Sequence, residues 1–433
     1  MRRLGWTLLD SVGRRAALAR PGQRSDPRLQ SAVRAIVEDV RERGWAGLAA
    51  HALRIDDAQP RCIAVGKAAG EARATLAPEQ VEAMELAARN IRAFHQGSLP
   101  SEHAVETMPG LVVRKVWRPI DRVGLYIPGG RTPLFSTLLM LALPAQAAGV
   151  KELVVTTPPD HRDGGLDPVI ALAAQLCGIE AVWTAGGAQA IAALAFGAGD
   201  IPRVDKICGP GNAWVAEAKT LVASMPGGPA IDMPAGPSEL LVIADEGAEP
   251  PMVAADLLSQ AEHDASAQVL LVTPSAALAD RVEAEVERQV AELPRRTVAE
   301  ASLKEARVIV CASLDQAVEI ANLYAPEHLS LAVENAEALL PLVRNAGAVF
   351  AGPLAAETFG DYLAGSSHVL PTDGAARAWS GVSVHTFLKA MTVQTVTPEA
   401  ARAIAGPAAA LARLEALEAH ARAADARGGE AAA

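Results

Sequence analysis

Two polar side chains stand three residues apart in an apolar segment, Leu257-Leu-Ser-Gln-Ala-Glu-His-Asp264. Gln260 offers an amide oxygen and His263 an imidazole nitrogen, so the pair could bind a metal ion or a polar ligand. Residues three apart share one face of a helix, which lets both side chains point at the same place. Taken alone, the pair is more typical of a solvated helix end, because glutamine is an uncommon metal ligand. A binding role therefore depends on partners elsewhere in the chain.

A carboxylate and an imidazole are neighbours in Pro326-Glu327-His328. These side-chain types are the ones that most often move protons near neutral pH. Neighbours in a regular strand face opposite sides of the sheet, so both groups serve one site only if Pro326 begins an irregular turn. As an isolated tripeptide, the segment is predicted to lie at the surface.

Three glycine-containing turns follow predicted strands. Gly209-Pro-Gly-Asn212 ends a strand and opens a helix, where free backbone N–H groups and the helix dipole can hold a phosphate. A tight turn with Asn212 as the helix cap is an equally good interpretation. Gly129-Gly130 and Gly186-Gly187 stand at comparable places, which is where open α/β sheets bind ligands. None of the turns has the G-x-G-x-x-G pattern, so they indicate a ligand crevice without identifying a dinucleotide.

Further candidates lie toward the C-terminus. Asp361 and His368 stand in a glycine-rich, turn-like stretch, and Glu415 and His420 stand on a predicted last helix. Each of them alone is typical of a solvated charge or a cap. Four of the candidate side chains together offer two nitrogens and two oxygens, a set that suits a divalent ion such as zinc: Gln260, His263, Asp361 and His420. Their separation in the sequence does not bring them together.

The elements that would carry these groups follow from the apolar periodicity. Spacings of three and four residues predict helices from Asp26 to about Phe94. From Pro128 onward, short apolar runs alternate with helical segments in two series, which predicts two α/β units with mostly parallel sheets, joined at residues 232–237. The predicted strands are 153–156, 181–184, 204–207, 240–244, 269–272, 308–310 and the apolar run 348–350, and the helices are 168–177, 189–196, 213–222, 252–260, 277–293 and 314–323.

Two other segments differ from this alternation. Residues 110–128 contain two β-rich runs broken at Pro119 and Asp121, which predicts a hairpin or paired strands. After about Thr386 the chain reaches Thr397-Pro-Glu-Ala, and from there the sequence predicts one long helix that ends near Arg427. An isolated helical arm must pack on something, and a partner subunit is one candidate.

Composition excludes several classes of protein. At 433 residues the chain exceeds one ordinary domain. A formal charge of −11 with 3% aromatic residues argues against a nucleic-acid surface. No uncharged stretch reaches membrane-spanning length, and no signal-peptide core forms near the first residue. Four widely spaced cysteines without a CxxC pair predict a reducing cytoplasmic location.

Several sequence blocks resemble the L-histidinol dehydrogenase family, the zinc- and NAD-dependent enzymes of histidine biosynthesis. The resemblance covers nearly the whole chain, in this order: Gly124-Leu-Tyr-Ile-Pro-Gly-Gly130, Gly186-Gly-Ala-Gln-Ala-Ile191, Gly209-Pro-Gly-Asn212, Asp232-Met-Pro-Ala-Gly-Pro-Ser-Glu239, Ser259-Gln-Ala-Glu-His263, Pro326-Glu-His-Leu329, Gly360-Asp-Tyr362, His368-Val-Leu-Pro-Thr372 and Met391-Thr-Val-Gln394. Two positions depart from the family pattern: Ser367 replaces an asparagine and His385 replaces an acid. Neither is a proposed metal ligand.

The resemblance implies a role for each candidate residue. Glu327 and His328 are the expected acid/base pair. The expected zinc ligands are Gln260, His263, Asp361 and His420, the last from the other subunit of an intertwined homodimer. The expected NAD contacts are Tyr126, Gln189 and Asn212. The expected contacts to the substrate, L-histidinol, are Ser238, Gln260, His263, His328, Asp361, His368, Glu415 and His420.

The resemblance also implies an architecture and a reaction. Two incomplete Rossmann-like domains are expected, with a helical N-terminal segment and a C-terminal helical arm. The expected parts are residues 1–23, which pack with the C-terminal region; 24–127 with 238–380, which carry the acid/base and metal residues; 128–237, which bind NAD; and the dimerisation arm 381–433. The reaction is the oxidation of L-histidinol through L-histidinal to L-histidine, with one zinc per subunit and two NAD⁺ consumed.

Three other functions are open at this point. A related zinc- and NAD-dependent dehydrogenase would act on another polar alcohol, such as a sulfonated diol, but Glu415 and His420 favour a substrate with an imidazole. A zinc hydrolase would use Glu327 to activate water and would need no nicotinamide. A binding or assembly protein would have no turnover, which the intact acid/base pair argues against.

Overall fold

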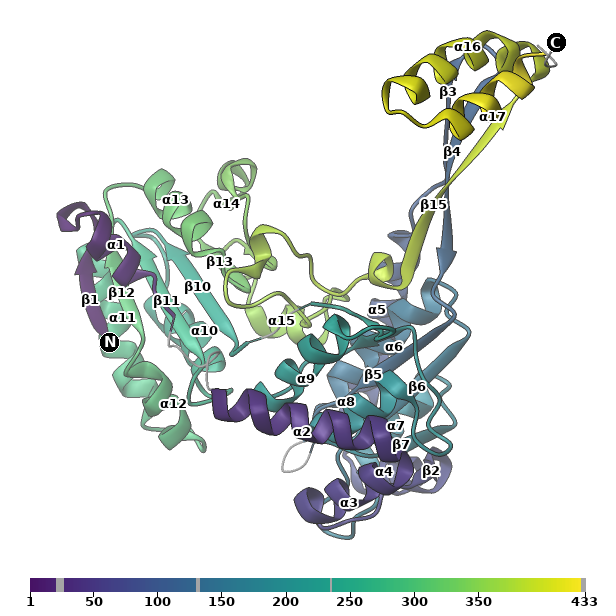
Figure 1. Cartoon of the computed structure of the whole chain (residues 1–433). Coiled ribbons are helices and arrows are strands. Elements are labelled where there is room, and N and C mark those ends of the chain that lie inside the picture. Colours follow the sequence, from purple (N-terminus) through teal and green to yellow (C-terminus); the bar gives the residue numbers. More distant parts are fainter. Residues whose placement is uncertain (21–26, 130–132, 234–235, 430–433) are drawn as a thin grey trace. The chain divides into compact units, whose positions relative to one another are not determined.

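The computed structural model describes residues 1–20, 27–129, 133–233 and 236–429. Its contacts divide the chain into two units (Figure 1). The first unit comprises Met1–Ser98 and Asp121–Phe387, and the second comprises Leu99–Ile120 and Leu388–Ala433. Gly130, from one of the glycine turns, and part of the expected joint 232–237 lie outside the described residues. Among the described residues, no helix is both long and apolar enough to cross a bilayer.

One parallel sheet of the first unit follows the predicted alternation of strand and helix. Its strand order is β2-β7-β6-β5-β8-β9, and only the edge pair β2–β7 is antiparallel. The strands are β2 (Cys62–Ala64), β5 (Arg122–Tyr126), β6 (Glu152–Thr157), β7 (Ala181–Thr184), β8 (Lys206–Cys208) and β9 (Ala230–Ile231). The helices between them are α6 (Phe135–Ala147), α7 (Pro168–Leu176), α8 (Gly187–Phe196) and α9 (Ala213–Ser224).

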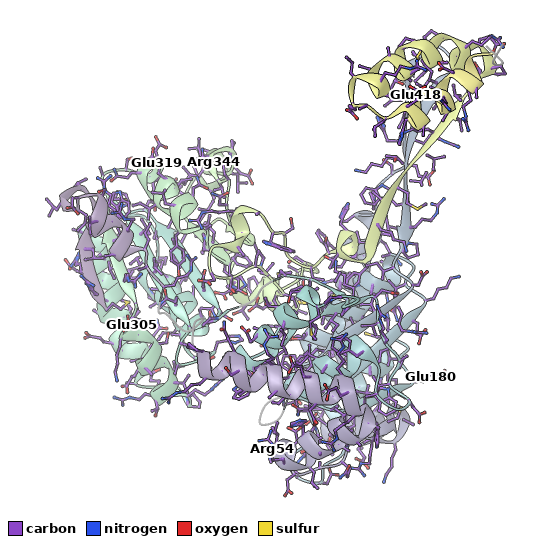
Figure 2. All side chains as sticks on the ribbon, in the orientation of Figure 1. Arg54, Glu180, Glu305, Glu319, Arg344 and Glu418 are labelled. Carbon is purple, nitrogen blue, oxygen red and sulfur yellow. The ribbon has the colours of Figure 1, made fainter. Side chains whose placement is uncertain are left out.

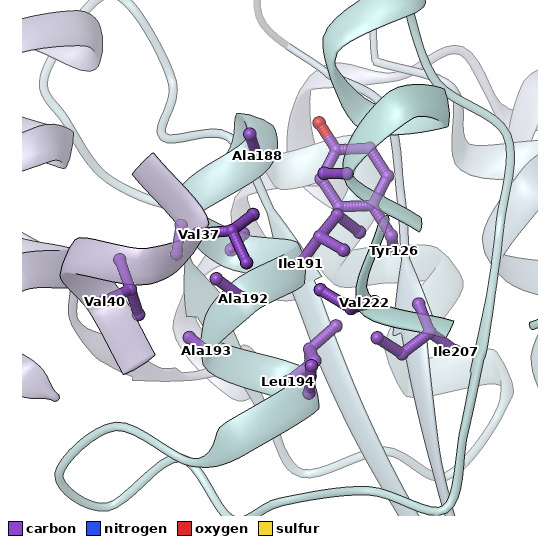
Figure 3. Packing of buried hydrophobic residues seen from close by; sticks show 14 of the residues in the cluster. Val37, Val40, Tyr126, Ala188, Ile191, Ala192, Ala193, Leu194, Ile207 and Val222 are labelled. Carbon is purple, nitrogen blue, oxygen red and sulfur yellow. The ribbon is translucent and has the colours of Figure 1, made fainter. Parts of the chain in front are cut away.

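Helices from the N-terminal part of the chain pack against the helices that flank this sheet. They are α2 (Pro27–Arg43), α3 (Trp45–Asp56), α4 (Val65–Thr75) and α5 (Pro78–Gly97), which confirms the predicted helical region apart from the short strand β2. Val37 and Val40 of α2 pack against Ala192 and Ala193 of α8, and the same cluster reaches Tyr126 at the end of β5 (Figure 3). Small alanine side chains on α8 allow the two helices to approach closely. The apolar face of α2, which its periodicity predicted, therefore packs on the α8 side of the sheet.

The other parallel sheet of the first unit has the order β1-β12-β11-β10-β13-β14. Its strands are β1 (Arg2–Gly5), β10 (Glu239–Ala244), β11 (Gln268–Thr273), β12 (Arg307–Val310), β13 (His328–Ala332) and β14 (Ala348–Ala351). The associated helical elements are η1 (Trp6–Leu8), α1 (Ser11–Ala17), α10 (Pro250–Ala261), α11 (Ala276–Val290), α12 (Arg296–Leu303), α13 (Leu314–Tyr324), α14 (Ala336–Leu339), η2 (Leu340–Leu342), α15 (Glu357–Tyr362) and η3 (Ala375–Arg377). The short helix η4 (Val384–Phe387) instead contacts α6 and β8 of the other sheet. Strands β10 and β11 are buried at every position, as expected for a parallel sheet covered on both faces.

The N-terminal residues join this second sheet. Strand β1, which was not among the predicted elements, pairs with β12 in parallel. Trp6 and Ala17 belong to the apolar cluster on one face of the sheet. The structure thus places Arg2–Gly5 beside β12 within the first unit, and the packing of residues 1–23 with the C-terminal region stays a prediction. Charged side chains such as Arg54, Glu180 and Glu305 project outward from the first unit (Figure 2).

The second unit is built from an antiparallel sheet and two helices. The sheet order is β15-β4-β3, with β3 at His103–Met108, β4 at Leu111–Pro119 and β15 at Leu388–Val396. The prediction that the two β-rich runs pair with each other is wrong, because β4 pairs with β3 and β15 while β5 joins a parallel sheet. The predicted single C-terminal helix is also wrong: it is α16 (Pro398–Leu414) and α17 (Glu418–Gly428), separated at Ala416, whose φ is 59°.

Candidate active site

Glu327 and His328 are buried side by side at the start of β13. Their exposed fractions are 5% and 4%, so the predicted surface placement is wrong. Helix α13 ends with Ala325 in the left-handed conformation, and the chain then turns into the strand at His328. This turn brings the Glu327 carboxylate to 3.7 Å from Nδ1 of His328. Both groups therefore serve one site, as the irregular-turn alternative required.

Two further carboxylates surround the His328 imidazole. Oε1 of Glu357 lies 3.4 Å from Nδ1, and Oδ1 of Asp361 lies 3.6 Å from Nε2. The Phe350 ring stacks on the imidazole with centroids 5.8 Å apart. Ligand atoms of His328, Glu357 and Asp361 all lie within 4.8 Å of one another, so this cluster has the dimensions of a metal site.

The cluster is rich in negative charge, and its pKa values reflect that. Burial raises the pKa of Glu327 to about 8 and that of Glu357 to about 8. Burial alone would lower the pKa of His328, but the carboxylates around it raise the pKa to about 10. Burial would raise the pKa of Asp361, yet His328 and two other histidines lower it. Three acids around one imidazole stabilise a positive charge at this position, whether a proton or a metal ion.

Gln260 and His263 come from the end of α10, a helix that contacts α15, which carries Glu357 and Asp361. Gln260 is in the last turn of α10, 1% exposed, and its Oε1 has no hydrogen-bond partner among the described residues. A buried acceptor without a partner is costly, so a cation or a ligand donor would satisfy it. His263 lies just beyond α10 and is exposed, and its charge lowers the pKa of Asp361. The predicted shared helical face is therefore wrong in detail, because only Gln260 is within the helix.

His368 and Ser238 are also placed by local contacts. Nδ1 of His368 lies 3.1 Å from the carbonyl oxygen of Asp361, and its Nε2 lies 3.1 Å from Oγ1 of Thr137. Ser238 directly precedes β10, and its carbonyl accepts from the N–H of Gln268. Glu415 and His420 are exposed residues of the second unit, so their relation to Asp361 stays a prediction.

The expected NAD contacts lie at the carboxyl ends of strands in the other sheet. Tyr126 ends β5, and its hydroxyl accepts from the N–H of Gly187 at 3.2 Å. Gln189 is fully buried, and its Nε2 donates to Oδ2 of Asp56 at 3.1 Å. Asn212 caps α9 by accepting from two backbone N–H groups, which confirms the helix-cap interpretation. Binding of a phosphate at this turn stays a prediction.

Comparisons with known proteins agree with one another. A model of the histidinol dehydrogenase family matches residues 18–428. A protein named histidinol dehydrogenase from Xanthomonas euvesicatoria pv. vesicatoria is 49% identical over 433 residues, which is all of both chains. One of the same name from Xylella fastidiosa strain Temecula1 is 46% identical over 432 residues and 100% of each chain.

The crystal structure of histidinol dehydrogenase from Elizabethkingia anophelis has a TM-score of 0.93 to this structure. The two are 40% identical, and the match covers 99% of this chain and 98% of that one. The chain belongs to the histidinol dehydrogenase family.

Family membership decides among the functions left open by the sequence. Histidinol dehydrogenases are NAD-dependent oxidoreductases of histidine biosynthesis, and the chain is an enzyme of this class. The comparisons do not favour a dehydrogenase of another polar alcohol, and they give no support to a hydrolase or to a protein without turnover.

Sequence reasoning missed two residues that lie against the candidate site residues. Glu357 lies in the cluster around His328, and its spacing of four from Asp361 on one helix was the available signal. Asp56 holds the amide of Gln189 from the end of α3, and burial raises its pKa. No sequence pattern marks Asp56, because it contacts a residue 133 positions away.

Proposed function

We propose that the chain oxidises L-histidinol through L-histidinal to L-histidine and consumes two NAD⁺ at one site. One observation carries this proposal: a buried carboxylate and imidazole, Glu327 and His328, lie 3.7 Å apart in a chain of the histidinol dehydrogenase family. An alcohol oxidation needs a base for the hydroxyl proton, and the aldehyde must be hydrated before a second hydride can leave.

Zinc fits the residues of the site. The unpartnered Oε1 of Gln260 and the carboxylate of Asp361 are oxygen ligands, and His263 offers a nitrogen. We infer that these three and His420 of a second copy hold one zinc ion per subunit, a mixed N/O set that zinc accepts. When bound, the ion supplies positive charge and a fixed orientation for the nitrogens of the substrate.

Each protein step belongs to a named side chain. The positive charge of an ion held by Asp361 would lower the pKa values of His328 and Glu327, so that each could act as a base. His328 accepts the hydroxyl proton as the first hydride passes from the carbinol carbon to NAD⁺, which leaves the aldehyde and NADH. Glu327 accepts a proton from water as the water adds to the aldehyde carbon, and His328 returns its proton to the former carbonyl oxygen, which gives the hydrate and leaves the imidazole neutral. His328 then accepts the hydroxyl proton of the hydrate while the second hydride reduces another NAD⁺, and the product is the carboxylic acid.

Binding residues are assigned by the family resemblance and by their places in the two sheets. Tyr126, Gln189 and Asn212 are proposed to contact NAD⁺, since their strands end at one edge of a parallel sheet, the usual place for a ligand. The proposed contacts to histidinol are the metal ligands together with Ser238, His328, His368 and Glu415.

A homodimer is proposed to complete the site. Helix α16 exposes large apolar side chains in the single chain, with Leu411 65% and Leu414 84% exposed. Apolar patches of this kind favour association, and a second copy would bring Glu415 and His420 to the active site. The four free cysteines support the proposed location in the cytoplasm.

NADH yield tests the reaction. The purified enzyme should form two NADH per L-histidinol by absorbance, and chelation of the metal should abolish turnover. His328→Asn should retain zinc while kcat falls by about 10²–10⁴-fold, the usual contribution of a general base. A yield of one NADH per substrate would support an alcohol dehydrogenase of different specificity, and near-normal kcat in the variant would remove His328 as the base.

A further inference from the structure

Glu239 contacts both members of the proposed acid/base pair through its backbone. Its N–H donates to Oε2 of Glu327 at 2.9 Å, and its carbonyl oxygen lies 3.2 Å from Nδ1 of His328. Glu239 is the first residue of β10, whose neighbour β13 begins at His328. The position of this one peptide segment therefore fixes where the carboxylate and the imidazole point.

The side chain of Glu239 is anchored by three hydrogen bonds. Arg20 donates from Nε to Oε1 at 2.5 Å and from Nη2 to Oε2 at 2.8 Å, which is a bidentate pair. The backbone N–H of Asp373 also donates to Oε1, at 2.9 Å. The side chains of Arg20 and Glu239 are 16% and 2% exposed, so water screens the pair weakly.

Arg20 also holds the segment that leads to Glu327. Its Nη2 donates to the carbonyl of Tyr324 at 2.9 Å, and its guanidinium lies 3.9 Å from the centroid of the Tyr324 ring. Tyr324 is the last residue of α13, immediately before the left-handed Ala325 and the turn into β13. One guanidinium therefore joins the chain entering β10 to the chain entering β13.

We propose that Arg20 and Glu239 are positioning residues that hold Glu327 and His328 in the geometry for proton transfer. The proposal rests on the roles given to Glu327 and His328 in the proposed function. A planar guanidinium is needed because it bonds both carboxylate oxygens and a carbonyl at once, whereas the ammonium of lysine is a point charge. Neither side chain touches the substrate in this proposal.

The test compares Arg20→Gln with Arg307→Gln in the full-length enzyme with L-histidinol and NAD⁺. Arg307 is a matched control, because it is 8% exposed in the same sheet and donates to the carbonyl of Ala17, but it makes no hydrogen bond to Glu239. Arg20→Gln should lower kcat by about 10- to 100-fold, since a misplacement of roughly 1 Å costs about 10²-fold. Its KM for histidinol and its zinc content should stay near the wild-type values.

The control separates positioning from stability. Arg307→Gln should lower the melting temperature about as much as Arg20→Gln while kcat stays within about twofold, because it leaves the Glu327 segment in place. Arg20→Lys should recover part of the lost kcat. Equal loss of kcat in the two glutamine variants, or kcat within twofold of wild type in Arg20→Gln, would overturn the proposal.

Two more variants test the proposal if Arg20→Gln does not fold or if His328 is not the base. If Arg20→Gln does not fold, Glu239→Gln replaces it in the test. The glutamine amide keeps the side-chain volume and the backbone contacts of Glu239 but weakens the pair with Arg20. The same fall in kcat is expected, and an unchanged kcat would refute the proposal. His328→Asn is assayed in parallel. Activity retained in His328→Asn removes the proposed base and with it this inference, whereas an inactive His328→Asn with an active Arg20→Gln removes the positioning role alone.

Discussion

The ammonium nitrogen of Lys219 lies 2.5 Å from Oδ1 of Asp232, and both side chains are buried, with exposed fractions of 3% and 0%. The pair also holds the turn after β8 through the backbone of Gly209. Lys219 donates to the carbonyl of Gly209, and Asp232 accepts from the N–H of Gly209, each at 2.7 Å. This turn carries the proposed NAD contact Asn212. A charged pair inside the protein therefore fixes the edge of a proposed cofactor site.

Lys219→Met should destabilise the protein strongly. The variant leaves the Asp232 carboxylate buried without its cation, which costs about 3–5 kcal/mol. Denaturant unfolding measures the loss. Lys67→Met is the control, because Lys67 is 91% exposed and its pair with Glu71 should contribute less than about 0.5 kcal/mol. Equal losses in the two variants would contradict a structural role for the buried pair.

Gly209→Ala should damage the same turn by a steric route. Gly209 has a φ of +132°, and an added Cβ would lie 2.0 Å from the backbone oxygen of Tyr126. We expect a large loss of stability and of NAD⁺ affinity, measured by thermal unfolding and ligand titration. Gly178 is the control: it has a φ of +67°, and an added Cβ would meet no atom within 4 Å. Gly178→Ala should therefore cost only about 1–2 kcal/mol of backbone strain. Similar losses in both would show that the clash is relieved.

Asp361→Asn should lose zinc, because the amide replaces a charged ligand by a weak neutral one. Glu357→Gln is the matched test, since Glu357 lies in the same buried cluster but is not a proposed ligand. We expect metal analysis after dialysis to show near-stoichiometric zinc in Glu357→Gln and a strong reduction in Asp361→Asn. The reverse order would move the metal toward the His328–Glu357 side of the cluster.

His95 should make the protein less stable in acid. It is fully buried, neither ring nitrogen has a hydrogen-bond partner among the described residues, and burial lowers its pKa to about 4. The unfolded chain binds a proton below about pH 6.5, so the stability present above that pH is lost as the pH falls toward 4.

The variant His95→Leu should reduce this dependence and leave stability at pH 7 equal or higher, because unpartnered polar atoms are removed. Urea unfolding at pH 5 and pH 7 measures the difference. His103→Gln is the control, since His103 is exposed on β3, and it should leave the pH dependence unchanged. An unaltered slope in His95→Leu would assign the acid sensitivity to other groups.

Local periodicity predicted many of the alternating strands and helices of both parallel sheets, because those runs are clearly apolar, but α6 and β13 were not among the predicted elements. Short or polar elements escaped it: β1 has the sequence Arg-Arg-Leu-Gly, and its place beside β12 depends on contacts about 300 residues away. The break at Ala416 also escaped, since alanine favours helix and only the packing of α16 on α17 requires the left-handed turn.

The site was predictable in its residue types but not in its geometry. Glu327 and His328 were identified as a proton-moving pair, yet their burial depends on neighbouring strands that no local pattern describes. The ligand set came from the family resemblance. Glu357 and Arg20 were not identified from the sequence. The spacing of Glu357 from Asp361 is informative only once the structure is known, and the partner of Arg20 is 219 residues away.

The antiparallel pairing of β4 with β15 has a consequence during synthesis on the ribosome. Leu111 pairs with Val396 and Pro119 with Leu388, so β4 leaves the ribosome long before its partner exists. At about 5–20 residues per second, the wait is roughly 13 to 57 s. Throughout that time the hairpin of β3 and β4 has an open edge, and the nascent chain must avoid pairing it with another polypeptide.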